Sequence, residues 1–561
     1  MRFLFIFLFF CSFCDGQNLI SKDYFQLPLD IPMQLAGNFA ELRPNHFHAG
    51  FDFKTNQREG LPIFAVADGY VSRIKISNVG YGKAIYITHP NGYTSVYGHL
   101  QKAVGIIETK IITHQYEAKS YEIESFFTPG DLPISKGQQI AISGNTGGSE
   151  GPHLHFEIRD NKTEKSINPL LFGYDLKDTK PPKINNLVVF PVDDNATVNQ
   201  SKRPISLNLT LQADGTYLAE KVLAIGKIGF GIIASDFDDV SYNNNGIYKT
   251  QLIANGKPIF GYEFDQLNFD EARVVNALID YDRYKKTHQR VQKLFMKSVF
   301  EWSNVTDNFE NGIITVEPNF TKSVRIEVSD FKQNKVLLFV PIAYSNLPAL
   351  IPTLTLKTPY FLKAKTDNVY EKENWSVSFP AKTFYDDFYL NFNVFGASLK
   401  LHDDTIPAQT NFTITYDCAG LSNTDKLFIA SKYNGKLNYI FSYLKDNILS
   451  CKTKTLGDFE VARDTIAPKI SINKSIEKQT ISNLNGIKFT ISDDFSGIKS
   501  YNAFLNNQWI LMEYESKLKR LLPNQTNIVL NNGTNILKVI VVDNVGNSTT
   551  FETQFNVDSK N

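Results

Sequence analysis

The sequence has little methionine, tryptophan or cysteine and no excess of either charge. Its 561 residues include 4 Met, 3 Trp and 4 Cys, and 58 Lys and Arg balance 58 Asp and Glu. Because no long basic run is present to neutralise a phosphate backbone, nucleic acid is not an expected partner. Hydrophobic residues make up 42% and charged residues 21%, a composition that excludes wholesale disorder and a collagen-like fibre.

Long hydrophobic runs are also missing, apart from one short block at the N-terminus. A charged first dipeptide precedes the apolar residues 3–10, which is the pattern of a secretory signal peptide. The block is shorter than the roughly 20 apolar residues that span a bilayer. We expect a signal peptide over residues 1–16 and a mature chain exported to the periplasm or cell envelope, with no transmembrane span. The alternative, lipid modification of Cys14, is disfavoured by the bulky Phe13 before it.

Aromatic residues, by contrast, are abundant. The 43 Phe and 26 Tyr favour strands over helices. Residues 84–89 and 93–97 read as two strands around Asn91-Gly92, a pair that tolerates the positive φ angles of a tight hairpin turn. Residues 63–76 show a second strand-turn-strand pattern. The sequence therefore predicts an all-β fold class.

One phrase occurs twice in the chain and indicates a duplication. Residues 178–184 read DTKPPKI and residues 464–470 read DTIAPKI, and each copy opens a run of short alternating strands. Two copies imply duplicated β-sandwich domains, and the repeated sequence resembles that of bacterial immunoglobulin-like modules. At about 150 residues per domain, the length predicts three to four domains. After the signal peptide we expect a first domain at 17–175 with an insertion at about 101–133, an Ig-like β-sandwich at 176–346, a third β domain at 347–462 and an Ig-like β-sandwich at 463–561.

Two of the four cysteines lie in the body of the chain. Cys11 and Cys14 belong to the N-terminal segment, which excludes a four-cysteine zinc site. In an oxidising compartment Cys418 and Cys451 are expected to form a disulfide that contributes about 3–4 kcal/mol. The alternative is two unrelated buried thiols.

Two short acidic runs raise the question of calcium. Residues 236–239 read DFDD and residues 493–494 read DD. Neither run has the glycine and terminal glutamate of an EF-hand loop. We expect both to be solvated β-turns.

Two patches of histidine carry the strongest chemical signal. His48 and Asp52 are four residues apart, a spacing that places them on one side of either a helix or an extended segment. In a strand, His153, His155 and Glu157 share one face while the alternate apolar residues face the other. Two imidazoles and one carboxylate are ligands that zinc accepts, with a fourth tetrahedral position left to water. Such a set predicts a catalytic rather than a structural zinc site.

The order of these patches resembles the lysostaphin-type (LytM-like) zinc metallopeptidases, which cleave peptide cross-links in bacterial peptidoglycan. The resemblance rests on residues 48–52 (HAGFD), 97–100 (YGHL) and 144–157 (GNTGGSEGPHLHFE). It covers about residues 35–173, less than a third of the chain. It implies an antiparallel β-sheet peptidase domain at the N-terminal end.

The resemblance also implies the roles of five residues. One Zn²⁺ would be held by His48, Asp52 and His155, and His99 and His153 would be the catalytic pair that does not bind the metal. A dication lowers the pKa of water towards about 7. One imidazole would act as general base and the other as the oxyanion or leaving-group partner, and the sequence does not order the two.

The remaining polar residues near these motifs are given supporting or structural roles. Glu157 is expected to fix an imidazole by a hydrogen bond, since no His-Glu-x-x-His helix is present to supply a general-base glutamate. The insertion at about 101–133 is expected to form a lobe on one wall of the cleft and to narrow the range of cross-links admitted. Five histidines are expected to be structural: His46, His89, His114, His288 and His402.

These observations predict an exported zinc metalloendopeptidase that hydrolyses amide bonds in peptidoglycan stem peptides. Its β domains would position it in the envelope or bind an envelope protein. One alternative is a non-catalytic LytM-like regulator of other cell-wall hydrolases, although such proteins lose zinc ligands and this chain has all three. The other is an adhesion or secretion module. The sequence does not specify which cross-link is cut.

Overall fold

The computed structural model describes residues 21–297, 301–353 and 357–558. The predicted signal peptide, with Cys11 and Cys14, lies outside these residues. Strands account for 46% of the structure and helices for 8%, which confirms the mainly β fold class. Within the described ranges, no helix has the length and apolar character needed to cross a bilayer.

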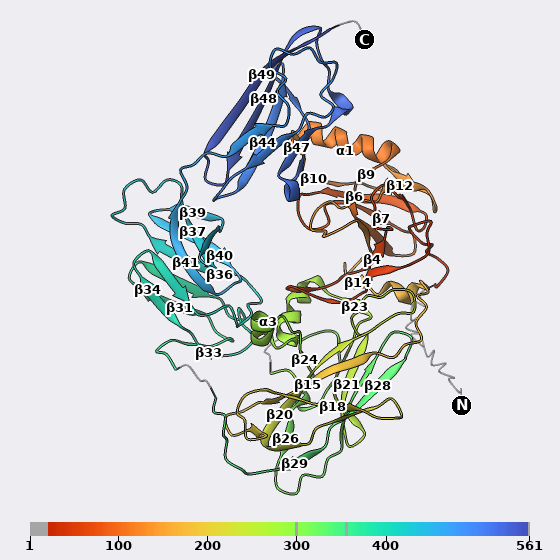
Figure 1. Ribbon diagram of the computed structural model, residues 1–561, viewed down its shortest axis with the longest axis vertical. Coiled ribbons are helices and arrows are strands. Elements are labelled where there is room, and N and C mark those ends of the chain that lie inside the picture. The colour runs from red at the N-terminus through yellow and green to blue at the C-terminus, as the bar shows by residue number, and fades with distance from the viewer. Residues whose placement is uncertain (1–20, 298–300, 354–356, 559–561) are drawn as a thin grey trace, which may run out of the picture.

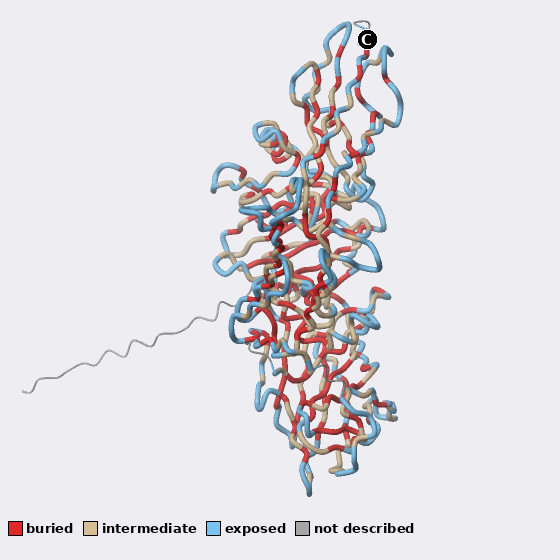
Figure 2. The backbone as a smooth tube through the Cα atoms, turned by 90° about the vertical axis from the view of Figure 1, so that its left-hand side faces the viewer, coloured by how far each residue is buried: buried red, intermediate tan, exposed pale blue. Residues whose placement is uncertain are grey.

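The chain forms four successive β units, and the last returns to the first (Figure 1). Lys83 Nζ of the first unit lies 2.8 Å from Glu513 Oε2 of the last. The rings of Tyr116 and Trp509 also meet edge to face, with their centroids 5.2 Å apart. Seen from the side, the units form a narrow body with buried residues along its centre (Figure 2).

A ten-stranded antiparallel sheet forms the centre of the first unit and carries most of the predicted site residues. Its predicted hairpin, β7 with β8, turns at Gly92, where φ is +88°. In sheet order the strands are β1 (Leu35–Gly37), β4 (Phe51–Lys54), β13 (His153–Asp160), β8 (Tyr93–Leu100), β7 (Lys83–Thr88), β6 (Gly69–Ile76) and β10 (Ile123–Phe126), with β11 (Pro133–Ile134), β14 (Ser166–Ile167) and β23 (Gln266–Leu267) at the margins. Smaller elements complete the unit: β5 (Pro62–Phe64), β12 (Gln139–Ile142) and β9 (Lys102–Ala103) in one sheet, β2 (Leu42–Arg43) and β3 (His46–Phe47) in another, and η1 (Pro169–Phe172).

Strand β13 has the predicted alternation of faces. Leu154, Phe156 and Ile158 are completely buried in the apolar core of the unit. Because successive side chains of a strand point to opposite faces, His155 and Glu157 lie together on the other face, where they are hydrogen-bonded to each other. Burial of one face therefore fixes the direction of the site residues on the other.

The predicted insertion at 101–133 is present as a lobe built from α1 (Gly105–Ala118) and β10. Its α1 lines a pocket together with residues 145–147, and its β10 pairs with β6 at the sheet edge opposite β1 and β4. The effect of this lobe on the range of cross-links stays a prediction. Tyr116 of α1 also packs on Trp509 of the last unit. The lobe serves as a docking surface for the C-terminal end of the chain.

The second unit is a pair of seven-stranded sheets joined to the first unit by the pairing of β14 with β23. One sheet contains β16 (Thr197–Val198), β20 (Val222–Ser235), β15 (Lys183–Pro191), β17 (Ile205–Leu207), β24 (Gln292–Lys293), β26 (Ile314–Val316) and β29 (Ile342–Tyr344). The other contains β18 (Leu209–Leu211), β19 (Tyr217–Ala219), β28 (Lys335–Phe339), β27 (Val324–Ser329), β21 (Lys249–Ala254), β22 (Lys257–Glu263) and β25 (Val305–Asn308). Its helices are η2 (Phe269–Val274), α2 (Val275–Leu278), α3 (Tyr281–Thr287) and η3 (Glu310–Gly312).

The third and fourth units each contain two antiparallel sheets of equal strand number. The third has β31 (Asn368–Lys372), β32 (Trp375–Phe379), β36 (Phe412–Asp417), β40 (Ile448–Thr453) and β39 (Ser442–Lys445) in one sheet, β34 (Phe392–Phe395), β35 (Ser398–Leu401), β41 (Gly457–Arg463), β37 (Leu427–Tyr433) and β38 (Lys436–Tyr439) in the other, and the pair β30 (Phe361–Leu362) and β33 (Phe388–Tyr389). The fourth has β42 (Lys469–Ile472), β43 (Phe489–Ser492), β47 (Arg520–Pro523) and β46 (Met512–Glu515), then β45 (Gln508–Ile510), β44 (Ile498–Leu505), β48 (Gly533–Asp543) and β49 (Ser548–Val557), with η4 (Ser516–Leu518) and η5 (Gln525–Asn527).

The predicted Cys418–Cys451 disulfide is wrong. Both thiols are free and buried. Cys451 pairs across the ladder with Ile414, four residues before Cys418, and a rise of about 3.3 Å per residue separates the two cysteines by roughly 13 Å along the strands. A disulfide requires Cα atoms within about 7 Å. Burial raises the pKa of Cys451 to about 12, so this thiol is protonated and unreactive.

The prediction of a solvated turn at 236–239 is also wrong. Asp236 is 5% exposed and Asp238 is 0% exposed. Asp238 is satisfied locally, because its carboxylate accepts hydrogen bonds from Ser241 and Asn245. In the second run Asp494 is exposed, as predicted, but Asp493 is half-buried.

Candidate active site

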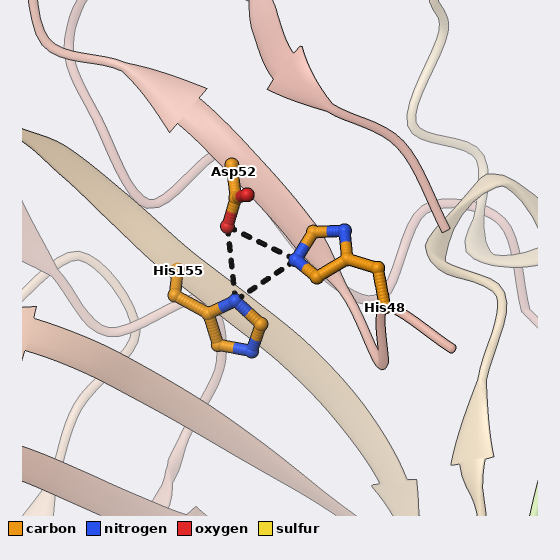
Figure 3. Close-up of side chains that lie close together, drawn as sticks. All are labelled: His48, Asp52 and His155. Carbon is orange, nitrogen blue, oxygen red and sulfur yellow. Dashed lines mark hydrogen bonds and ion pairs between the residues drawn. The ribbon is translucent and has the colours of Figure 1, made fainter. Parts of the chain in front are cut away.

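Three of the predicted residues converge on one point (Figure 3). Asp52 of β4 is paired directly with His155 of β13 in the sheet, and His48 lies in the turn that enters β4. Asp52 Oδ1 is 3.0 Å from both His48 Nε2 and His155 Nδ1, and the two nitrogens are 3.1 Å apart. A tetrahedral zinc ion with bonds of about 2.0–2.1 Å sets its ligand atoms about 3.3 Å apart, close to this spacing.

The outer hydrogen bonds of the two imidazoles fix which nitrogens face the centre as acceptors. His48 Nδ1 donates to the carbonyl oxygen of Asn38 at 2.7 Å, and His155 Nε2 donates to Glu157 Oε1 at 2.7 Å. Neutral imidazole carries one N–H, so the inward nitrogens present lone pairs. These lone pairs and a carboxylate oxygen of Asp52 then face one another at about 3 Å, an arrangement that requires a shared proton or a cation. The donor set therefore fits a metal ion.

The charges of the site also favour a cation at its centre. Burial alone would lower the pKa of His155, but hydrogen bonds to Asp52 and Glu157 raise it to about 9. Burial would raise the pKa of Asp52, yet the charge on His48 and hydrogen bonds from the surrounding histidines hold it well below its usual value. The site thus keeps Asp52 ionised and attracts positive charge.

A buried network behind His155 holds its ring in place. Glu157 Oε2 accepts from Arg159 Nε at 2.7 Å, and the Tyr81 hydroxyl donates to Glu157 Oε1. The Tyr81 ring also stacks on His155, with centroids 4.9 Å apart and planes at 20°. Burial opposes ionisation of Glu157, but the charge of Arg159 and the bond to His155 lower its pKa to about 2. The predicted supporting role of Glu157 is confirmed.

Sequence reasoning missed Tyr81 and Arg159. The alternation of β13 contained a signal for Arg159, because it follows Glu157 by two residues and so shares its face. Tyr81 lies 74 residues from His155 in a turn before β7, and no periodic pattern joined the two.

Glu157→Gln is expected to raise the zinc dissociation constant by about 10–100-fold, the usual cost of losing a carboxylate that supports a metal-binding histidine. The amide can still accept from His155, but it carries no charge to balance Arg159. Competition with a fluorescent zinc chelator measures the change. Glu117→Gln, on the exposed side of α1, is the matched control, and an unaltered zinc affinity in Glu157→Gln would contradict the assignment.

His99 and His153 stand beside the three converging residues. Their ring centroids are 4.7 Å apart, and His153 Nε2 is 3.4 Å from Asp52 Oδ1. His99 Nδ1 donates to the carbonyl of Thr146 at 2.8 Å and His153 Nδ1 to that of Gly151 at 2.8 Å. Nε2 of each neutral ring therefore carries no proton and can accept one. Burial, with the nearby charges of His155 and His153, lowers the pKa of His99 to about 3, so this ring is neutral at neutral pH.

The backbone around His99 is unusual. Its φ is +58°, a left-handed conformation that is uncommon for residues other than glycine and is concentrated at functional sites. The backbone N–H of His99 donates to the carbonyl of Tyr81 at 2.8 Å. The turn that stacks Tyr81 on His155 therefore also directs His99 towards the site.

The loop that holds both rings is fixed by close packing and by the last unit. At Gly147 φ is +71°, and a Cβ there would lie 2.3 Å from the backbone nitrogen of Gly82, so only glycine fits. Lys517 Nζ donates to the carbonyl of Asn145 at 2.8 Å and to that of Ser149. The C-terminal unit thus contacts the loop on both sides of Thr146, the partner of His99.

Two of the histidines that were predicted to be structural, His46 and His89, lie near the site in sequence or in the sheet but are bonded elsewhere. His89 is buried and bonded to the Asp68 carbonyl and the Ser95 hydroxyl. His46, two residues from His48, is exposed and bonded to the carbonyl of Pro44 at 2.9 Å. Neither faces the converging ligand atoms.

Comparison with known proteins decides the family. Residues 46–115 and 109–169 match the family model described as Peptidase family M23. Lipoprotein NlpD of Yersinia enterocolitica is 36% identical over 113 residues, which are 20% of this chain and 90% of that protein. The chain belongs to peptidase family M23. The resemblance to LytM-like peptidases expected from the sequence is confirmed.

Longer relatives share only this M23 region. DD-carboxypeptidase/endopeptidase Mpg of Neisseria meningitidis serogroup B is 32% identical over 161 residues, covering 28% of this chain and 31% of Mpg. The murein hydrolase activator NlpD of Escherichia coli is 35% identical over 114 residues, covering 20% of this chain and 23% of the activator. The chain therefore spans less than a third of the length of these relatives.

The third unit of the M23 protein matches a different family. Residues 359–464 match the model described as a Zu5-like domain, where the sequence patterns had indicated only a third β domain. The immunoglobulin-like assignment of the second and fourth units stays a prediction.

Proposed function

We propose that this M23 protein is an exported zinc metalloendopeptidase that hydrolyses amide bonds in the peptide cross-links of peptidoglycan. The observation that carries the proposal is the convergence of two imidazole lone pairs and the Asp52 carboxylate, with His99 and His153 beside them. His48, Asp52 and His155 would hold the ion. The similarity to Mpg, a DD-carboxypeptidase/endopeptidase, supports hydrolysis of a peptide bond, and the resemblance to LytM-like peptidases supports peptidoglycan as the substrate class.

Zinc in a site with three protein ligands lowers the pKa of water to about 7 and polarises a carbonyl oxygen. The chain supplies the proton transfers. His99 and His153 each have Nδ1 committed to a backbone carbonyl, so each can accept a proton at Nε2. An imidazole that has accepted a proton becomes a donor, which can stabilise a developing oxyanion or protonate the leaving amine.

The exclusion of water from behind the site strengthens these interactions. His155 and Glu157 are buried, and the core side chains of β13 close the opposite face of the sheet. In such surroundings the attraction between fixed charges and developing charge is stronger than in water. Tyr81 and Arg159 keep the ring of His155 from rotating during the reaction.

The direct test is incubation of the purified mature chain with zinc and defined cross-linked muropeptides. Mass spectrometry of the products identifies the bond that is cut. The proposal expects loss of cross-linked dimers with wild type and no loss after chelation of zinc. Absence of any cleavage across muropeptides of different cross-link chemistry would contradict the enzyme assignment.

A second candidate is a non-catalytic activator of other cell-wall hydrolases. The similarity to the Escherichia coli murein hydrolase activator over the M23 region favours it. A complete set of metal-binding side chains argues for an enzyme instead. If wild type and His155→Ala are equally inactive on muropeptides and equally stimulate an added cell-wall hydrolase, the protein is an activator.

The remaining units would place the enzyme in the envelope. The second, third and fourth units together exceed the M23 region in length, and the fourth contacts the catalytic loop through Lys517. Attachment of the exported chain to an envelope protein through these β units is part of the proposal. An adhesion or secretion role for them alone would leave the histidine cluster unexplained.

A further inference from the structure

Three aspartates meet at the junction of the first and second units. Carboxylate oxygens of Asp178, Asp236 and Asp330 all lie within 4.8 Å of one another. Asp178 belongs to the linker before β15, Asp236 directly follows β20, and Asp330 directly follows β27. The cluster thus ties a linker to the ends of two strands, one from each sheet of the second unit.

The same arrangement recurs at the start of the fourth unit. Asp464, Asp493 and Asp543 also bring carboxylate oxygens within 4.8 Å of one another. The register shows that the two clusters are equivalent. Lys183 and Lys469 occupy the same place in the repeated phrase, and they pair with Ser235 and Ser492. Asp236 and Asp493 come directly after these two serines, so they occupy equivalent positions.

An asparagine completes both clusters in the same way. Asn334 Nδ2 donates to Asp330 Oδ2 at 2.7 Å and to the Asp178 carbonyl at 3.2 Å. Asn547 Nδ2 donates to Asp543 Oδ2 at 2.7 Å and to the Asp464 carbonyl at 3.1 Å. Both copies of the repeated phrase are therefore held by equivalent contacts, which extends the duplication from the sequence to individual hydrogen bonds.

The first cluster contains a buried carboxylate oxygen that has no hydrogen-bond donor. Asp236 is 95% buried, and its Oδ1 is fully covered and has no hydrogen-bond partner. Within the described ranges no ion pair reaches Asp178, Asp236 or Asp330. Burial and the neighbouring carboxylates raise the pKa of Asp236 to about 8 and that of Asp178 to about 6. A buried carboxylate is costly unless a cation or hydrogen-bond donor accompanies it.

We propose that Asp178, Asp236 and Asp330 bind one Ca²⁺. Carboxylate oxygens are hard ligands that suit Ca²⁺, whereas zinc sites in proteins include imidazole or thiolate ligands, and the three residues of this cluster offer neither. A further oxygen is available close by, since Asn245 faces Asp236 in an isolated bridge and its buried Oδ1 also has no partner. The comparison with an EF-hand failed because these ligands come from three separate segments rather than from one loop.

The site stabilises a loop that leads to the catalytic domain. Backbone bonds of 2.9 and 3.0 Å join Asp236 to Asn245. The next residue, Gly246, exchanges two hydrogen bonds with the side chain of Asn38, at 2.9 and 3.0 Å. The carbonyl of Asn38 in turn accepts from His48. Calcium at the cluster would therefore hold the second unit in the position that supports Asn38.

The test measures calcium binding by the full-length mature chain kept saturated with zinc. The chain is freed of calcium with EGTA, which also removes zinc, and is dialysed and given one equivalent of Zn²⁺. It is then titrated with Ca²⁺ at 0.15 M NaCl in a calorimeter. A dissociation constant of about 10⁻⁴–10⁻³ M or tighter is expected, as in other extracellular calcium modules. Asp236→Asn is expected to bind one ion fewer, or to bind it at least about 10-fold more weakly, because it removes one of three charged ligands.

Asp214→Asn is the matched control, since it makes the same change of charge on an exposed loop of the same unit. Calcium binding by Asp236→Asn that equals the binding by Asp214→Asn would overturn the proposal. Absence of calcium binding by the wild type at millimolar Ca²⁺ would overturn it as well.

Thermal unfolding separates a calcium ligand from a merely structural aspartate. Without calcium, Asp236→Asn should be at least as stable as the wild type, because the substitution removes repulsion between buried carboxylates. With calcium, the wild type should gain more in Tm than the variant, since a ligand that binds only the folded state stabilises it. The same loss of Tm in the variant with and without calcium would refute the proposal.

Discussion

Replacement of His155 by alanine is expected to abolish zinc binding and to lower hydrolysis of cross-linked muropeptides by at least about 10³-fold. The substitution removes one of the three inward-facing ligand atoms and leaves His48 and Asp52 with an incomplete set. A metal ion contributes several kcal/mol to charge stabilisation in such reactions, and each 1.36 kcal/mol corresponds to a factor of ten in rate. Elemental analysis of the purified variant and mass spectrometry of the products measure the two effects.

The control for this experiment is His46→Ala. His46 is two residues from His48 but is exposed, and its ring is bonded to the carbonyl of Pro44, so loss of this ring should leave one zinc per chain and unchanged hydrolysis. Thermal unfolding of both zinc-free variants checks that the fold survives. A His155→Ala chain that still carries one zinc and cleaves at the wild-type rate would refute the ligand assignment.

The sequence predicted the parts of the site that depend on local periodicity. The alternation of β13 placed His153, His155 and Glu157 on one face, and the turn at Gly92 placed His99 at the end of the following strand. The convergence of Asp52 with His155 was of a different kind. It depends on the pairing of β4 with β13, two strands about 100 residues apart, and only the resemblance to a known family indicated it.

The errors arose where the register between distant strands decides the outcome. Cys418 directly follows β36 and Cys451 lies in the neighbouring strand β40, but the ladder offsets them by four residues. The composition of the chain does not contain this offset. Asp236 looked like a turn residue because its two carboxylate neighbours, Asp178 and Asp330, come from segments about 60 and 90 residues away. The burial of the Asp236 carboxylate can be recognised only after the fold has brought those segments together.

The sequence pattern also did not indicate that the last unit contacts the first. Lys517 is one of 58 basic residues, and nothing local distinguishes it from a solvated lysine. The last unit returns to the first (Figure 1), and this closure lets Lys517 of η4 contact Asn145 and Ser149. Sequence analysis treats successive domains as independent, and a contact of this kind depends on all the junctions between them.

Separate substitution of His99 and His153 by alanine is expected to leave zinc bound and to lower kcat by about 10²–10⁴-fold, the range attributed to a positioned acid or base. Neither ring is among the three converging ligands, so elemental analysis should still find one zinc per chain. The two variants should differ on a substrate whose leaving group needs no proton, such as an activated ester of a stem peptide. Loss of the leaving-group partner should be largely rescued on that substrate, whereas loss of the general base should not.

This comparison assigns the roles that the sequence left open. The Nδ1 atoms of both rings are held alike by the carbonyls of Thr146 and Gly151. Nε2 of His153 also lies 3.4 Å from Asp52 Oδ1, so the two rings differ in their surroundings although both can accept a proton. The substrate distinguishes their roles. The general base takes its proton from water before the amine leaves, whereas the leaving-group partner donates its proton as the amine leaves. Wild-type kcat in either zinc-loaded variant would remove that histidine from the mechanism. Equal rescue of both would show that the two rings exchange roles.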